Sequence, residues 1–171
     1  MILKSIYVTT ILSTITLIGA SEAFAKEVPF EVAIVKNSTG SGEIMSGNFQ
    51  SGINKLIKDK KAGIKYDIDT GLCVAYLKMN DLDKAELSCT AAINTIKSTN
   101  RFSDFHKSIS YNNRAISRYL NNNVSGAIDD LNKAISLDNN RIVKKNINLL
   151  LEQKTDTENY SSLETEETIS E

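Results

Sequence analysis

Apolar and small residues recur along the chain in three similar blocks, which hold Gly52, Ala85 and Ala127 at equivalent positions. In the last block Ala127, Leu131 and Ala134 follow one another at helical spacing, which places them on one face of a helix. A short polar break separates each of the last two blocks from the apolar run before it, as is typical of two antiparallel helices. The pattern therefore predicts an all-α chain made of repeated helical hairpins.

The small residues in these blocks predict places where helices come unusually close. Gly52, Ala85 and Ala127 stand just inside the second helix of each expected hairpin, where it meets the first. Ala92 and Ala134 follow two turns later, where they would let the next hairpin approach. A bulky residue at any of these positions is expected to overpack the contact, at a cost of about 1–3 kcal/mol.

The spacing between the blocks is uneven. Gly52 and Ala85 are 33 residues apart, whereas Ala85 and Ala127 are 42 apart. Residues 98–108 hold the excess, and we expect either a longer loop or a lengthened first helix there. Residues 141–154 keep a helical period and are expected to cover the last hairpin, as closing helices do in repeat arrays. The apolar positions of that last segment are Ile142, Ile147, Leu150 and Leu151.

The two ends of the chain differ in composition from its middle. Residues 1–25 combine a basic start, a short apolar run and an Ala-x-Ala end, which predicts a secretory signal peptide cut after Ala25, with an uncleaved membrane anchor as the alternative. Residues 26–46 alternate in a strand-like way at first and are expected to form an extended segment before the helical domain, residues 47–153. Residues 154–171 are acidic and poor in apolar residues, so we expect them to be disordered.

Side chains suited to catalysis or metal binding are sparse. The one histidine, His106, lies in the long insertion, and nothing near it in the sequence marks a nucleophile. Two cysteines and one histidine fall short of the four ligands of a structural zinc site, and no phosphate-binding glycine loop occurs. The basic residues 58–61 lack flanking aromatic residues and are more typical of a solvated helix end than of a nucleic-acid patch. We therefore expect no catalytic residue, no metal, no cofactor and no nucleic-acid partner.

The blocks resemble the tetratricopeptide repeat (TPR), a helix–turn–helix with the motif W-x₂-L-G-x₂-Y followed by A-x₃-F. In the middle copy Leu72, Tyr76 and Ala85 match this motif, while Cys73 replaces the glycine and Cys89 the phenylalanine. The resemblance implies a short right-handed α-solenoid of about three TPR-like hairpins with a C-terminal capping helix.

The last copy departs further from the motif. Arg114 and Arg118 stand at its leucine and tyrosine positions, and Leu131 replaces the phenylalanine. The first copy keeps only its second helix, at residues 47–56. The likeness to TPR proteins therefore extends over about residues 47–140 and is strongest in the middle and last copies.

The two cysteines, Cys73 and Cys89, fall on the two helices of the middle hairpin in this alignment. An antiparallel hairpin brings these positions to neighbouring levels that face each other, so we expect a disulfide that closes a loop of about 15 residues. The alternative is a pair of buried thiols that act as small apolar residues. A disulfide would agree with export to an oxidising compartment.

The resemblance to TPR proteins also implies where a partner would bind. First helices line a concave face in such proteins, and on this chain the corresponding positions are Thr70, Val74, Leu77, Lys78, Asn112, Ile116, Tyr119 and Leu120. TPR proteins that grip a terminal carboxylate use several basic and Asn residues there; this chain offers only Lys78, Asn112 and Asn113, so that specificity is not expected. The alternative is that Val74, Ile116 and Leu120 simply pack between hairpins.

We therefore expect a non-catalytic protein–protein interaction module of the cell envelope, exported and most consistent with the periplasm. Its partner would be a protein or peptide bound on the concave face, with no stable membrane insertion once the signal peptide has been removed. Alternatives are a structural component that self-associates into a homo-oligomer, a carrier of a small ligand, and an enzyme whose site the sequence does not reveal.

Overall fold

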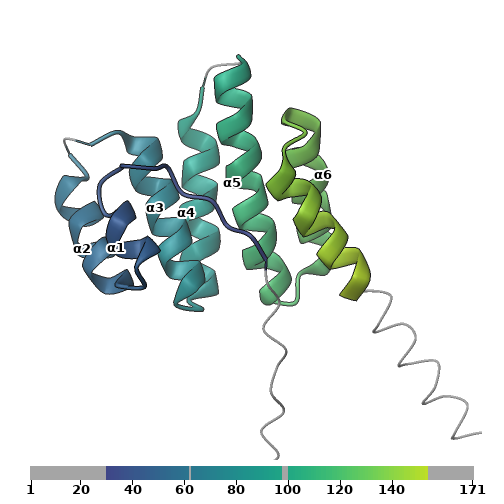
Figure 1. Ribbon diagram of the computed structural model, residues 1–171, viewed down its shortest axis with the longest axis horizontal. Coiled ribbons are helices and arrows are strands. Elements are labelled where there is room, and N and C mark those ends of the chain that lie inside the picture. The colour runs from purple at the N-terminus through teal and green to yellow at the C-terminus, as the bar shows by residue number, and fades with distance from the viewer. Residues whose placement is uncertain (1–29, 62, 98–99, 154–171) are drawn as a thin grey trace, which may run out of the picture.

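The computed structural model describes residues 30–61, 63–97 and 100–153, and within them the chain is all-α, with seven helices and no strand. Six of the helices are labelled in Figure 1, and the seventh, called the C-terminal helix below, follows α6. Their bounds are Ser41–Met45 for α1, Phe49–Asp59 for α2, Lys65–Lys78 for α3, Leu82–Thr95 for α4, Arg101–Leu120 for α5, Val124–Leu137 for α6 and residues 141–153 for the C-terminal helix.

One type of turn joins the helices in pairs. After α1, α3 and α5 the chain passes through a left-handed residue, Gly47, Asn80 or Asn122, with φ of 84°, 59° and 60°. Glycine and asparagine tolerate this conformation better than other residues, which explains why helices end there. The next N–H then closes each turn on a carbonyl five residues earlier: Asn48 on Glu43 at 2.8 Å, Asp81 on Tyr76 at 2.9 Å and Asn123 on Arg118 at 2.8 Å.

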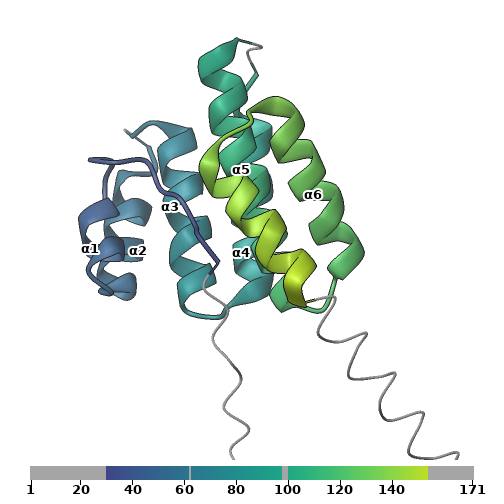
Figure 2. The same ribbon diagram turned by 45° about the vertical axis from the view of Figure 1, so that its right-hand side comes forward.

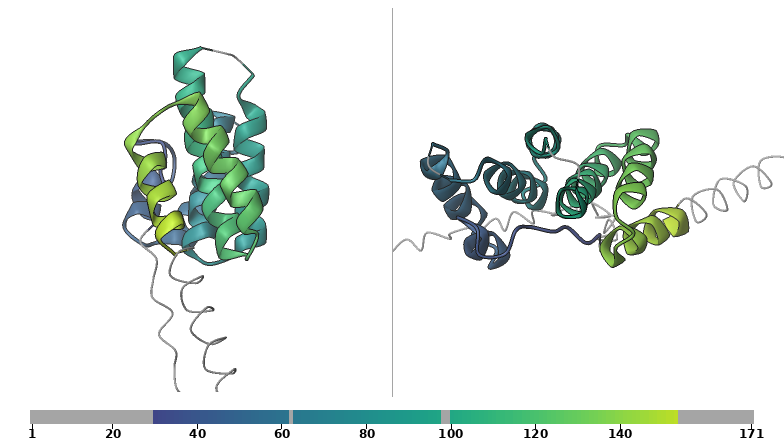
Figure 3. Two further views of the ribbon diagram at one scale, coloured as in Figure 1. Left: turned by 90° about the vertical axis from the view of Figure 1, so that its right-hand side faces the viewer. Right: turned by 90° about the horizontal axis from the view of Figure 1, so that it is seen from above.

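The hairpins made by these turns stand side by side in the order of the sequence. Each helix packs against the next, and α1 contacts α3 just as α3 contacts α5, so the first helices of the hairpins form one row. Figures 1 and 2 show this stack from two sides. Seen from above, the helices follow an arc, and the chain before α1 runs across its inner side toward the C-terminal helix (Figure 3).

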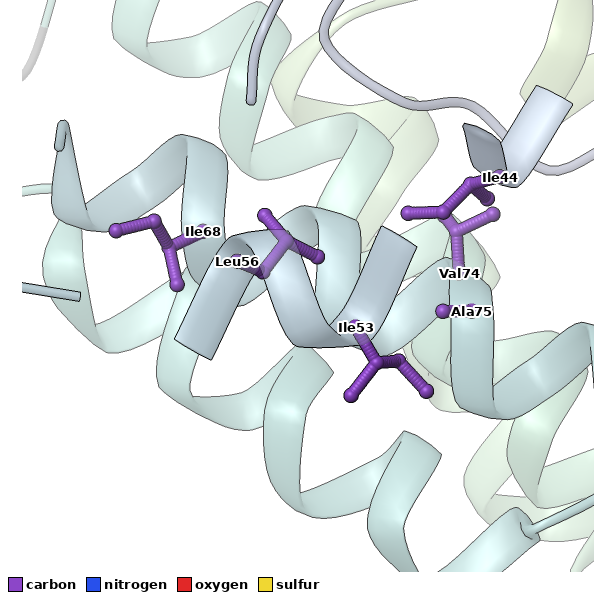
Figure 4. Close-up of a cluster of buried hydrophobic side chains, with 6 residues drawn as sticks. All are labelled: Ile44, Ile53, Leu56, Ile68, Val74 and Ala75. Atoms are coloured by element: carbon purple, nitrogen blue, oxygen red, sulfur yellow. The ribbon is translucent and has the colours of Figure 1, made fainter. Parts of the chain in front are cut away.

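The small residues of the three blocks lie at helix contacts, as expected. Ala85 and Ala127 are fully buried at the start of α4 and α6. In α2 a Cβ added to Gly52 would stand 2.6 Å from the Cγ1 atom of Ile44 in α1, so only glycine permits this approach. The side chains of α1, α2 and α3 then converge on one aliphatic core (Figure 4), made of Ile44, Ile53, Leu56, Ile68, Val74 and Ala75.

A disulfide joins α3 to α4. Cys73 and Cys89 are bonded, with their Cα atoms 4.9 Å apart, and both residues are buried. This confirms the predicted pair and excludes the alternative of two free thiols.

Charged side chains connect α5 to the helices on either side of it. The guanidinium of Arg114 donates two hydrogen bonds to the carboxylate of Asp130 in α6, at 2.7 and 2.8 Å, and one to the Thr90 hydroxyl in α4 at 3.1 Å. Arg118 lies 3.0 Å from the same carboxylate and 2.7 Å from that of Glu86. The two arginines therefore join α4, α5 and α6 through an ion-pair network in which Asp130 is buried and Arg118 and Glu86 are partly exposed.

Some helix boundaries differ from those expected from the sequence, and one of them decides between the two alternatives for residues 98–108. α5 is 20 residues long and takes up most of the insertion, so the lengthened helix is correct and the longer loop is not. Residues 26–46 were expected to be extended, but residues 41–45 form α1, which packs on α2 and α3. The signal peptide predicted at residues 1–25 and the disordered tail predicted at residues 154–171 lie outside the described residues.

The C-terminal helix packs through Leu150 and Ile147, as expected, but the face that it buries is shifted. Val143, Asn146 and Leu150 are buried, whereas Leu151 is 54% exposed. Ile147 packs at the edge of the core beneath α5 and α6. The buried face is rotated because the helix packs against α5 and against the chain before α1, and the latter contact calls for the polar Asn146.

Candidate peptide-binding site

An extended stretch of the chain lies across the inner side of the arc, where a partner was expected. This stretch, residues 30–35, is called the arm below (Figure 3). In an extended chain every second residue presents its N–H and C=O to the same side. Glu31 and Ala33 present theirs to α5 and the C-terminal helix, where three asparagines meet them.

Two of the asparagines each grip one residue of the arm at two points. The amide oxygen of Asn113 accepts the N–H of Ala33 at 3.1 Å, and its amide nitrogen donates to the carbonyl of Ala33 at 2.8 Å. Asn146 holds Glu31 in the same manner, with both bonds at 2.8 Å. A side-chain amide offers the same donor and acceptor as a peptide group. The pair therefore acts on the arm as a neighbouring β-strand would.

The third asparagine ties the pair together. Asn112 donates to the carbonyl of Glu31 at 3.1 Å and accepts a hydrogen bond from the amide of Asn146 at 2.8 Å. Asn112, Asn113 and Asn146, called the asparagine site below, are all fully buried. Buried amides without partners are costly, by about 1–3 kcal/mol each. The site therefore needs an extended backbone opposite it.

The side chains of the arm make a second set of contacts. Phe30 packs edge-on against Tyr119, with ring centroids 5.2 Å apart, and Val32 and Ile34 pack against the buried apolar clusters of the inner row. The side chain of Glu31 lies on the opposite side of the arm and faces a pair of basic residues.

That basic pair comes from the C-terminal helix. The carboxylate of Glu31 lies 2.7 Å from the Nζ atom of Lys145 and 3.8 Å from the guanidinium of Arg141. The hydrogen bond from Lys145 is the main cause that holds the pKa of Glu31 below its ordinary value of 4.5. The arm is thus held by its backbone, by alternate apolar side chains and by one charge.

The predicted binding positions lie in or near this region, but most of them are covered. Asn112 bonds the arm and Tyr119 packs on it, while Val74, Leu77 and Ile116 belong to the apolar clusters on which Val32 rests. Val74 and Ile116 are each 3% exposed, and Val32 of the arm packs on the clusters to which they belong.

The remaining predicted positions do not contribute to the asparagine site. Thr70 is buried within α3, whereas Lys78 and Leu120 are exposed at the last residues of α3 and α5. Leu120 is 40% exposed, so it does not pack fully between hairpins.

The sequence reasoning missed Asn146 and the arm itself. Asn146 stands between Val143 and Leu150 at helical spacing, so a polar residue occupies a core position of that helix. Such a residue must find a hydrogen-bond partner, and this was the one signal in the sequence that pointed to a second polar contact.

His106 lies in a different environment, at the N-terminal part of α5. Its ring packs edge-on against Phe102 at 4.2 Å and Tyr66 at 4.7 Å, and its carbonyl accepts a hydrogen bond from the Tyr66 hydroxyl. Burial lowers the pKa of His106, and the nearby Asp67 carboxylate opposes that shift. The imidazole is therefore part of an aromatic cluster that ties α5 to α3.

Comparisons with protein-family models, with curated proteins and with solved structures found no match to this chain. Among the described residues, no three His, Cys, Asp or Glu side chains gather in a way that could hold a metal ion. In the same part of the chain, none of the helices has the length and apolar character needed to traverse a bilayer.

Proposed function

We propose that this chain is a non-catalytic protein–protein interaction module that binds an extended segment of a partner on the inner side of its arc. The observation that carries the proposal is the pair of two-point contacts that Asn113 and Asn146 make with the backbone of Ala33 and Glu31. Because these contacts engage N–H and C=O groups and no side chain, the same site suits extended chains of many sequences, as in β-strand addition.

The module is a short right-handed α-solenoid of three TPR-like hairpins, closed by the C-terminal helix. Three equivalent turns, at Gly47, Asn80 and Asn122, and the buried small residues Ala85 and Ala127 support this assignment. In TPR proteins the first helices of the hairpins form the binding face, and here the row of α1, α3 and α5 lies on the side that the arm covers.

The module works in the periplasm, after export and removal of the leader at residues 1–25. The bond between Cys73 and Cys89 supports an oxidising compartment, since structural disulfides persist there and are rare in reducing ones. The partner is a protein or peptide of that compartment.

An array of random octapeptides tests the proposal. The full chain with Ala33→Pro, which removes the N–H that the arm donates to Asn113, should retain a subset of the peptides. Adding Asn113→Leu, which keeps the size of the side chain but removes its hydrogen bonds, should weaken the binding of that subset at least tenfold, because a weakened arm no longer offsets the loss. Asn132→Leu is the matched control, because Asn132 is exposed on α6. Circular dichroism of both variants checks that the helices are retained.

Two results would count against the module. If the chain retains no peptide, or if Asn113→Leu binds the same peptides as tightly as the Asn132→Leu control, binding at the asparagine site is excluded as the function.

A further inference from the structure

The arm occupies the very contacts that a partner segment would need. Asn113 and Asn146 have their donors and acceptors filled by Ala33 and Glu31, and Val32 covers the apolar floor. A partner therefore cannot reach the asparagine site while the arm is docked. The arm leaves the face through residues 36–40, where Asn37 and Gly40 adopt left-handed backbone conformations.

We propose that the arm is an internal competitor that holds the binding site closed, and that the partner segment which displaces it carries the arm's own pattern. That pattern is an aromatic residue, an acidic residue, an apolar residue, a small residue and an apolar residue, in an extended conformation. The inference rests on the proposed function, because it names the partner of that same site and the way in which the site is regulated.

The expected pattern of the partner follows from those contacts of the arm that depend on its side chains. The backbone bonds at Glu31 and Ala33 are open to any residue except proline. Specificity must come from the side chains: Phe30 against the ring of Tyr119, and the carboxylate of Glu31 between Lys145 and Arg141. Val32 and Ile34 lie on the same side of the arm as Phe30 and add to this selection by packing on the apolar clusters.

Each of these contacts excludes a class of competing peptide. A basic residue at the second position would face Lys145 and Arg141, and like charges at this distance repel. A polar residue at the third position would be buried without a partner. The preferred partner is thus a strand-like acidic–apolar segment and not a basic or proline-rich one.

Competition within one chain has a measurable consequence. A segment tethered through a short link acts at an effective concentration in the mM range. The apparent affinity for a free peptide is reduced by the fraction of chains in which the arm is docked. Weakening the arm without touching the asparagine site should therefore tighten the binding of a free peptide.

The test uses a fluorescent peptide with the arm's sequence, PFEVAIVK, titrated into two full chains. Ala33→Pro removes the N–H that donates a hydrogen bond to Asn113, so it weakens docking of the arm and leaves the asparagine site unchanged. We expect at least tenfold tighter peptide binding by Ala33→Pro than by the unmodified chain. Lys36→Ala, at an exposed position just after the arm, is the matched control and should bind like the unmodified chain.

Charge reversal tests the predicted specificity. The peptide PFKVAIVK should bind Ala33→Pro at least fivefold more weakly than PFEVAIVK does. Adding Lys145→Glu to that chain should reverse the preference, because the carboxylate then faces the lysine of the peptide.

A measurement on the unmodified chain keeps the test decisive even where Ala33→Pro fails to fold. At saturating PFEVAIVK, hydrogen exchange of the Glu31 and Ala33 amides should become at least tenfold faster, since the arm has been displaced. An equal concentration of PFKVAIVK should leave exchange of these amides much slower.

The outcomes separate the two proposals. If no peptide of any sequence binds the unmodified chain or Ala33→Pro, the proposed function itself fails. If peptides bind through Asn113 while the arm amides stay protected, or bind without preference for the arm's pattern, the function stands and the internal competitor is refuted. If mixed labelled chains form dimers by exchanging arms, the occupant is a second copy and the proposal is again overturned.

Discussion

The two long helices of the inner row, α3 and α5, occupy equivalent places in the arc but bury opposite chemistry. The buried face of α3 is mainly apolar and closes the core with α1 and α2 through Ile68, Val74 and Ala75. The buried face of α5 is mainly polar, with Ser103, Ser108, Ser110, Asn112, Asn113 and Ser117. Equivalent positions in a repeat can therefore carry out different tasks.

The polar side chains of α5 form hydrogen bonds with backbone groups of neighbouring segments, and this distinguishes α5 from α3. The hydroxyl of Ser117 donates to the carbonyl of Leu82 at 2.9 Å, that of Ser108 to the carbonyl of Asp138 at 3.3 Å, and Asn113 holds the arm. Aliphatic contacts tolerate small shifts, whereas hydrogen bonds fix where each backbone segment lies. In this chain α3 mainly contributes buried apolar surface, whereas α5 mainly fixes the positions of the neighbouring backbone segments.

The largest effect is expected at the charged contact of the polar half. Asp130→Asn leaves Arg114 and Arg118 facing each other with no carboxylate between them, and breaking a buried pair typically costs about 3–5 kcal/mol. We expect the free energy of unfolding, measured in urea, to fall by about 4 kcal/mol. Asp129→Asn, at the exposed neighbouring position, should change it by less than about 0.5 kcal/mol. Equal effects of the two variants would show that the ion-pair network adds nothing to stability.

A smaller loss is expected in the aliphatic half. Leu56 has no exposed surface, so Leu56→Ala removes buried methyl groups and leaves a cavity, which typically costs 2–5 kcal/mol. We expect a loss of about 3 kcal/mol in the same urea assay. Leu87→Ala is the control, because Leu87 is 71% exposed, and it should stay within about 0.5 kcal/mol of the unmodified chain. A loss under 1 kcal/mol for Leu56→Ala would mean that this half is loosely packed.

The disulfide should matter to a similar or slightly smaller extent. Cys73→Ala combined with Cys89→Ala frees a loop that spans 16 positions in the unfolded chain, which corresponds to about 3 kcal/mol in the chain-entropy account. Thermal melts of the double variant should show a lower midpoint than the oxidised chain. A reducing agent should lower the midpoint of the unmodified chain and leave that of the double variant unchanged. A melting temperature indifferent to reduction would contradict the expected role.

The smallest effect concerns the pH dependence of the arm. The docked state holds the pKa of Glu31 below 4.5, so the undocked arm binds a proton more readily. The contribution of this carboxylate is therefore complete above pH 4.5 and is lost as the pH falls through the lower value of the docked state. Because exposed ion pairs are weak, the docking equilibrium should change only about two- to fivefold.

Chemical shifts of the Ala33 amide between pH 6 and 3 would measure this change. Glu31→Gln removes the titrating carboxylate, so its docking should be weaker at pH 6 and should lack the component that depends on this group. A profile identical in both chains would show that Lys145 and Arg141 do not sense the charge of the arm.

Much of the helical framework could be predicted from the sequence, because its signals are local. Gly52, Ala85 and Ala127 recur at positions where helices touch, and short polar breaks separate the apolar runs of the last two hairpins. The pairing of Cys73 with Cys89 followed from the alignment of two helices in one hairpin. α1 could not be anticipated, since five residues carry too little periodicity to be distinguished from a turn.

The contacts of the asparagine site were harder to predict, because they join residues that are distant in the sequence and they are directed at backbone groups. Asn146 reaches Glu31 across 115 positions of sequence, and Asn113 reaches Ala33 across 80. The side-chain pattern of the arm does not indicate that distant asparagines bond to its backbone N–H and C=O groups. Val143 is buried in place of Leu151 for the same reason, because the face that the C-terminal helix buries depends on distant segments that pack against it.

The asparagine site also imposes an order of events on the newly made chain. The arm leaves the ribosome early, whereas Asn113 and then Asn146 follow 80 and 115 positions later. Docking of the arm thus has to be among the last steps of maturation, after the final helix has been made. Under the proposed function, a partner that meets the chain before this step would compete with an arm that still lacks its two hydrogen bonds to Asn146.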